Sequence, residues 1–171
     1  MENEIKFRDI HLTRLEILRH VFSDSYIYDG NMGTIDSTFG CIKKGEATFV
    51  CKNNTFSCTA GDFFYIPDGI IYESYWSGNP EIEFYITNFR FTVTKPGNVS
   101  LDRLFALQKV IRPDFEQIAK KTESLYYIQQ KSPALAIARF YDIFNEIYPF
   151  LKKEKLSSIN PAVLPAVTYI E

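Results

Sequence analysis

Short runs of alternating residues, each closed by a turn signal, fill residues 39–93 and constrain the fold more than any other feature. The run EATFVCK (46–52) alternates strictly, so its apolar side chains fall on one face of an extended strand. Asn53-Asn54 follows, and asparagine tolerates the positive φ angles of a two-residue hairpin loop. Short strands at this spacing are typical of an antiparallel sandwich or barrel.

Two further turn signals divide the next part of the chain. In AGDFFYIPDGIIYES (60–74), the turn residues Pro67-Asp68-Gly69 separate two apolar runs that we predict to be strands. Gly78-Asn79-Pro80 predicts another turn before a strand over 81–93.

Helical periodicity begins after residue 112. Pro113 suits the first position of one helix, and Ser132-Pro133 suits the start of a second. The second helix carries more apolar residues than one helix face can bury against its own domain. Either it is sandwiched between barrel and neighbouring helix, or part of it meets another subunit, and both can hold. The candidate dimerisation residues are Ile137, Phe140, Tyr141, Phe144, Ile147 and Tyr148.

Charge and cysteine usage exclude several classes of protein. The net charge is −2 without a basic stripe, so nothing favours binding to a phosphate backbone. The charged N-terminal residues 1–14 rule out a signal peptide, and no apolar run is long enough to span a bilayer. Cys41, Cys51 and Cys58 form no CxxC pair, which favours buried thiols in a reducing cytoplasm.

Few residues could carry catalysis. The histidines are His11 and His20, both before the predicted barrel strands, so we expect no metal and no other cofactor. No nucleophile elbow and no glycine-rich phosphate loop occurs. Acid/base chemistry by Tyr72, Glu73 or Glu83 remains an alternative. Aromatic residues make up 16% of the chain, which suits a small-molecule pocket with flat walls.

Four stretches together resemble the sensor part of AraC-type bacterial transcription regulators, a branch of the cupin barrels. AGDFFYIPDGIIY (60–72) is similar to that family's P-G-D-x-x-x-x-P-P-G-x-x-H stretch, and EFYITNFRF (83–91) to its following aromatic strand. VIRPD (110–114) resembles the junction into the helices, and PAVTYIE (165–171) the opening of the DNA-binding half. The resemblance implies a mainly β fold with C-terminal helices: a cupin-like antiparallel β-barrel (jelly-roll) followed by an antiparallel helix pair.

The resemblance also implies three parts along the chain with different roles. Residues 1–111 would form the barrel with an N-terminal arm, 112–155 a helical pair for dimerisation, and 156–171 a linker with the first turns of a truncated DNA-binding domain. The barrel would bind a small-molecule effector such as a sugar, and the ligand would order residues 1–20 over the barrel mouth. DNA contact would come only from the missing helix-turn-helix part of a homodimeric, non-enzymatic regulator. No contact with a membrane is expected.

The family's sugar-contacting positions fall on Lys44, Tyr72, Ser74, Phe84 and Ile86. Tyr72 stands where the family has a metal-binding histidine, which turns the interior from a catalytic site toward a recognition pocket. Trp76, on the predicted loop after the Tyr72 strand, either supplies a stacking face or packs as a cover of the barrel rim. Two alternatives remain: a purely structural dimerisation domain without ligand, and a metal-free cupin enzyme such as a sugar isomerase or epimerase.

Overall fold

The computed structural model describes residues 10–52, 54–93, 105–111 and 115–153. Its strands are β1 (Ile10–Asp29), β2 (Ser37–Lys44), β3 (Glu46–Cys51), β4 (Asn54–Thr59), β5 (Phe63–Ile66), β6 (Glu73–Val93) and β7 (Gln108–Val110). Its helices are α1 (Phe115–Ile128), α2 (Pro133–Ile147) and the short 3-10 helix η3 (Tyr148–Phe150).

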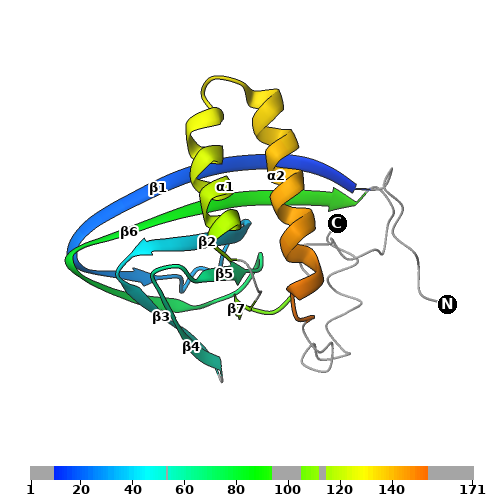
Figure 1. Ribbon diagram of the computed structural model, residues 1–171. Coiled ribbons are helices and arrows are strands. Elements are labelled where there is room, and N and C mark those ends of the chain that lie inside the picture. Colours follow the sequence, from blue (N-terminus) through cyan, green and yellow to red (C-terminus); the bar gives the residue numbers. More distant parts are fainter. Residues whose placement is uncertain (1–9, 53, 94–104, 112–114, 154–171) are drawn as a thin grey trace, which may run out of the picture.

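The strands form one antiparallel sheet that curls into a nearly closed barrel. Strand order is β4-β3-β6-β2-β5-β7, and β1 pairs with β6 along almost its whole length. The first part of β6 pairs with β3 and the later part with β2. The β1/β6 register shifts between Ser23 and Ser25, and there the long ribbon bends back over itself (Figure 1). The predicted mainly β barrel followed by a helix pair is confirmed.

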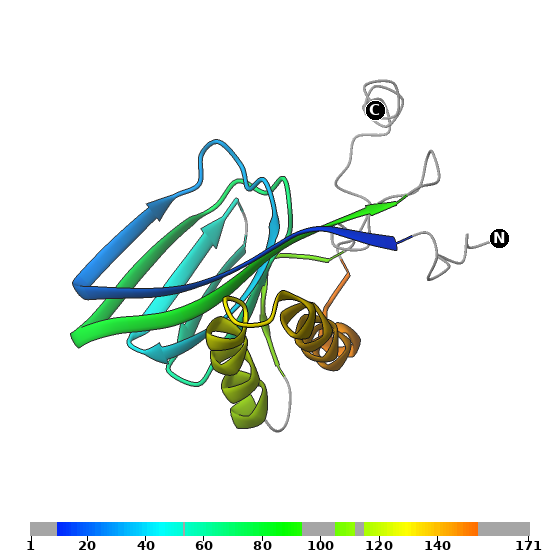
Figure 2. The same cartoon turned by 90° about the horizontal axis from the view of Figure 1, so that it is seen from above.

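The helix pair covers one outer face of the barrel and creates a second core. Figure 2 shows α1 and α2 side by side against the β1/β6 ribbon. Strand β5 separates the two cores: Phe63 and Tyr65 point to the helices, while Phe64 and Ile66 point into the barrel. Because both faces of β5 are covered, all four of its residues are buried and no polar alternation is needed.

The second core is built largely from phenylalanine. Phe89 is fully buried, and its ring centroid lies 5.1 Å from that of Phe140 and 5.4 Å from that of Phe144. The turn after α1 is fixed to β1 by Gln129, whose side chain accepts from the N–H of Ile17 at 3.3 Å and donates to its carbonyl at 2.7 Å. These contacts hold the helices to the sheet through both apolar burial and backbone hydrogen bonds.

Two predictions are wrong: the strand boundary at residues 78–80 and the placement of residues 10–20 in an arm. Gly78-Asn79-Pro80 does not end a strand, because β6 runs through it and bends there together with β1. Residues 10–20, expected in an arm over the barrel mouth, belong to β1 and are paired with β6. The remaining residues of the expected arm, 1–9, lie outside the described residues, as do 154–171 with the predicted opening of a DNA-binding part. The β3/β4 hairpin is confirmed, but its loop lies one residue earlier than predicted: Asn54 pairs with Cys51 as the first residue of β4, and Lys52 has a φ of 42°.

The candidate dimerisation residues of α2 and η3 divide into two sets. Phe140, Phe144 and Ile147 are buried in this chain's own core, so they do not lie on an exposed face. Ile137, Tyr141 and Tyr148 keep exposed fractions of 43%, 38% and 38% and remain accessible. The buried set agrees with a helix packed against its own domain, and the exposed set is available for contact with another subunit. Within the described ranges, no helix has the length and apolar character to cross a membrane.

Candidate functional site

The barrel interior contains a cavity of about 440 Å³. Its walls come from β1, β2, β3, β5, β6 and the segment that leads into β2, so strands from most of the sheet line it. Seven of the eighteen lining residues are aromatic, and one end of the cavity is polar. The aromatic residues that line it are Tyr26, Tyr28, Phe49, Phe64, Tyr72, Trp76 and Phe84.

Five of the six predicted ligand-binding residues line this cavity. Ser74, Trp76, Phe84 and Ile86 all sit at even-numbered positions of β6, and Tyr72 lies just before its first residue. Because successive side chains of a strand point to opposite faces, the even positions share the barrel interior. The odd positions of the later part, such as Tyr85 and Phe89, belong to the core under the helices.

Trp76 is part of the cavity wall and not of a loop. It lies within β6 and is 5% exposed. Its ring stacks on Phe84 with centroids 3.9 Å apart, and its indole N–H donates to the Ser74 hydroxyl oxygen at 2.9 Å. The indole is therefore held in one orientation by a ring on one side and a hydrogen bond at its edge.

Lys44, the sixth predicted residue, does not line the cavity. The β2/β6 register shifts between Ile42 and Lys44, so Ile42 stays opposite Phe84 while Lys44 faces Glu83. This irregularity moves Lys44 to the outer face, where its ammonium pairs with Glu81 at 2.5 Å and Glu83 at 3.5 Å. The hydrogen bond to Glu81 raises the pKa of Lys44.

The carboxylates considered for acid/base catalysis also lie outside the cavity. Glu73 is exposed and accepts a hydrogen bond from the Tyr75 hydroxyl. Glu83 is 4% exposed and bound by Arg19, whose Nε and Nη2 each lie 2.9 Å from Oε1. Burial acts to raise the pKa of Glu83, but the hydrogen bond and charge of Arg19 outweigh burial and lower that pKa. Of the three acid/base candidates, Tyr72 is the one that reaches the cavity.

Strand β1 supplies cavity residues that the sequence analysis missed. Arg14, His20, Tyr26 and Tyr28 line the cavity from even-numbered positions of β1. The imidazole of His20 stacks on Phe84 with centroids 5.0 Å apart, and burial lowers its pKa. The alternation of tyrosines at 26 and 28 was the available signal. It was obscured because apolar residues also occur on the other face, where Ile17 packs under the helices while Val21 and Ile27 are exposed.

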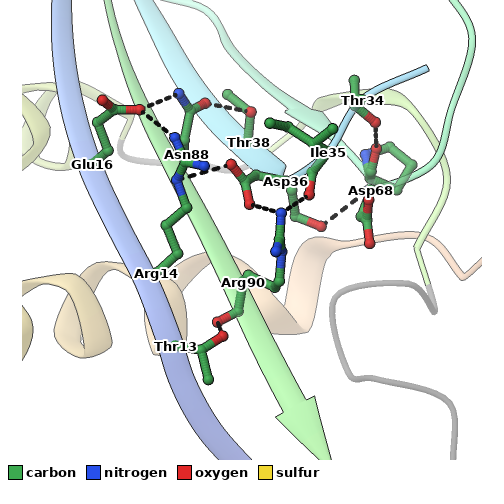
Figure 3. A network of polar contacts seen from close by, with 12 residues as sticks. Thr13, Arg14, Glu16, Thr34, Ile35, Asp36, Thr38, Asp68, Asn88 and Arg90 are labelled. Atoms are coloured by element: carbon green, nitrogen blue, oxygen red, sulfur yellow. Dashed lines mark hydrogen bonds and ion pairs between the residues drawn. The ribbon is translucent and has the colours of Figure 1, made fainter. Parts of the chain in front are cut away.

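The polar end of the cavity is a network of ion pairs and hydrogen bonds. Figure 3 shows Asp36 between two arginines: Arg14 Nε lies 3.1 Å from its Oδ2, and Arg90 Nη2 lies 2.8 Å from its Oδ1 without the angles of a hydrogen bond. Arg14 also pairs with Glu16 at 3.2 Å. The Asn88 side chain accepts from the Thr38 hydroxyl at 2.7 Å (Figure 3).

The tyrosine side of the cavity offers hydrogen-bonding groups without charge. Tyr72 and Tyr28 lie with ring centroids 5.3 Å apart, and Tyr72 is 8% exposed. Burial raises the pKa of Tyr72, so its hydroxyl stays protonated at neutral pH. Among the described residues, its hydroxyl has no hydrogen-bond partner. In the same described part of the chain, no three His, Cys, Asp or Glu side chains gather in a metal-binding group.

The match to a family covers the strands around this cavity. Residues 33–95 match the family described as the AraC-like ligand binding domain. No curated protein matches the chain.

Solved structures are similar to this chain at low sequence identity, and one of them shares its fold over most of its length. The AraC-like transcriptional activator CuxR is 11% identical, with a TM-score of 0.57 over 91% of this chain and 59% of CuxR. Fatty-acid-bound ToxT from Vibrio cholerae is 17% identical, with a TM-score of 0.49 over 82% of this chain and 58% of ToxT. A cupin-2 protein from Shewanella frigidimarina matches 47% of this chain at 12% identity and a TM-score of 0.35. The chain thus spans less than two thirds of either regulator.

Proposed function

Because residues 33–95 match the family described as the AraC-like ligand binding domain, we propose that the chain is the effector-sensing part of a transcription regulator. In this proposal a small molecule binds inside the barrel. The ligand binds two conformations with different affinity, and this difference changes the orientation of the helix-covered face relative to the rest of the regulator.

The observation that carries the proposal is the cavity inside the barrel, with its seven aromatic lining residues. Ligand pockets are typically 300–1,000 Å³ and mostly apolar, with a few polar groups that orient the ligand. The barrel cavity has about 440 Å³, aromatic walls and a polar end, and it is lined by Tyr72, Ser74 and Trp76. A sugar is the effector class that the family resemblance suggests, and aromatic rings suit the C–H faces of a sugar ring.

A non-catalytic role agrees with the placement of the candidate acids and bases. Glu73 and Glu83 lie outside the lining of the cavity, so these two carboxylates cannot serve an isomerase or epimerase as its acid and base there. No observation favours the enzymatic alternative over sensing.

Effector binding should be visible through Trp76, which is the single tryptophan of the chain. Because its ring forms part of the cavity wall, a bound molecule changes the surroundings of the indole. Titration with neutral sugars and small aromatic alcohols is expected to produce a saturable change in tryptophan emission for at least one compound. If none of them changes the emission or the melting temperature, the ligand-free dimerisation module becomes the better account.

Pairing of two chains through the helices is the second part of the proposal. The exposed residues Ile137, Tyr141 and Tyr148 form the accessible part of the α2/η3 segment, and large exposed apolar side chains favour association. In the full regulator, a helix-turn-helix part would then contact DNA as a pair. By itself this chain is not expected to bind a specific DNA sequence.

Ile137→Glu should shift the chain from dimer to monomer, because the substitution places a charge in an apolar interface. Light scattering coupled to size-exclusion chromatography measures the mass directly. Met32→Glu is the control, since Met32 is 93% exposed and lies in the loop between β1 and β2. A wild-type monomer at micromolar concentration, or a dimer that survives Ile137→Glu unchanged, would contradict this interface.

A further inference from the structure

We propose that the barrel cavity selects an uncharged, ring-sized ligand and excludes anions, because Asp36 and Glu16 together cancel the positive charge of Arg14 and Arg90 at its polar end. The inference rests on the proposed function and specifies the chemical class of its effector. It is carried by the ion pairs at the end of the cavity and by the uncharged side chains that line the rest of it among the described residues.

The first argument is the pairing of charges. Among the described residues that line the cavity, the charged side chains are Arg14 and Asp36, and they are bound to each other at 3.1 Å. Arg90 adds a second cation to Asp36, and Glu16 adds a second anion to Arg14. Two arginines and two carboxylates leave this cluster without net charge. A carboxylate or phosphate that entered here would find each guanidinium already engaged.

The second argument is the cost of burying a charge in the rest of the cavity. Burial lowers the pKa of His20, so the imidazole is neutral at pH 7 and supplies no cation. The neighbouring wall consists of stacked rings, with Phe84 against both His20 and Trp76. An anion placed against these rings would lose its water without gaining a counter-charge, which disfavours it strongly.

The third argument is the hydrogen-bonding capacity of the wall. The Thr38 hydroxyl is bonded to Asn88, and Ser74 already accepts the indole N–H of Trp76. The Tyr72 hydroxyl remains as a protonated donor that faces the cavity. A neutral ring compound with a hydroxyl or carbonyl group satisfies it, whereas a molecule with several charged oxygens does not.

Matched pairs of neutral and anionic compounds test the charge selection directly. Suitable pairs are benzyl alcohol with benzoate, 4-hydroxybenzyl alcohol with 4-hydroxybenzoate, and glucose with glucuronate. Each compound is titrated against the full chain at pH 7.5 by thermal shift and by Trp76 emission. For every pair that binds, we expect the neutral member to bind more than about tenfold tighter, because its partner buries an unpaired charge.

Two variants test whether the carboxylates neutralise the arginines at the polar end. Asp36→Asn keeps the side-chain size but leaves the cluster with one excess positive charge, so the preference should move toward the anionic member of each pair. Glu16→Gln removes a carboxylate from the more exposed side of the same cluster and should move the preference in the same direction. Because Glu16 is 43% exposed in its side chain, this second variant keeps the test available if Asp36→Asn fails to fold.

The outcomes separate this inference from the function on which it rests. Tighter binding of neutral members, with a shift toward anions in the variants, supports it. Tighter binding of the anions by the wild-type chain overturns the charge selection and leaves the sensing function standing. Unchanged preference in both folded variants overturns the assignment to Asp36 and Glu16. If neither member of any pair binds, the sensing function and the inference both fail.

Discussion

Replacing Phe89 by alanine is expected to lower the free energy of unfolding by about 3–5 kcal/mol, the range for removing a buried phenylalanine ring. Phe89 is fully buried at the centre of the core that joins the sheet to the helices. Its ring lies against Phe39 on β2 and against Phe140 and Phe144 on α2, so the cavity left behind would border three rigid rings. Such a site cannot collapse easily, which places the loss toward the upper part of the range.

Urea unfolding followed by circular dichroism measures this loss. Phe150→Ala is the matched control, since Phe150 is 38% exposed at the end of η3 and its removal should cost clearly less. Equal and small losses for the two variants would mean that α2 does not dock on the sheet as described. A loss confined to the helical signal would mean that the helices and the barrel unfold separately.

Local patterns were sufficient to predict the strands from β2 to β5. The alternation in 46–52 and the turn at Pro67-Asp68-Gly69 depend on neighbouring residues alone, so they can be read without knowing the fold. The same holds for Pro133 at the start of α2, although the Ser132 side chain makes no capping hydrogen bond.

Features that depend on distant residues could not be predicted in this way. Strand β1 was missed because apolar residues occur on both of its faces: Ile17 packs under the helices, Phe22 packs in the barrel, and Ile27 is exposed. Lys44 was placed in the cavity by the family resemblance. A register shift against β6 reverses the face, and that shift is set by pairing with a strand some forty residues away.

The cavity residues on β6 were predicted from the family resemblance, and strand alternation explains why they lie on one face. The family resemblance identified Tyr72, Ser74 and Ile86, and strict strand alternation then brought them to one face. The polar end was not identified, because Arg14 and Asp36 belong to different elements and meet only in the folded barrel. The second helix was correctly described as too apolar for one face, but the pattern alone could not separate buried Phe140 from exposed Ile137.

Filling the cavity is expected to abolish effector binding while the barrel stays folded. Ile86 lines the cavity from β6, and a tryptophan there would occupy space that the ligand needs. A ligand at about 100 times its Kd stabilises the folded state by about 2.7 kcal/mol, and this whole increment should disappear in Ile86→Trp. Ile27→Trp makes the same chemical change on the outer face, where Ile27 is 64% exposed opposite Tyr75, and should leave the increment intact.

The most direct measurement compares the ligand-induced rise in melting temperature for wild type, Ile86→Trp and Ile27→Trp, using a compound that changes Trp76 emission. We expect a rise of about 5–10 °C for wild type and for Ile27→Trp, from the usual relation between stability and melting temperature. Ile86→Trp should unfold cooperatively and show no rise. An equal rise in all three proteins would place the ligand elsewhere and contradict the barrel cavity as the effector site.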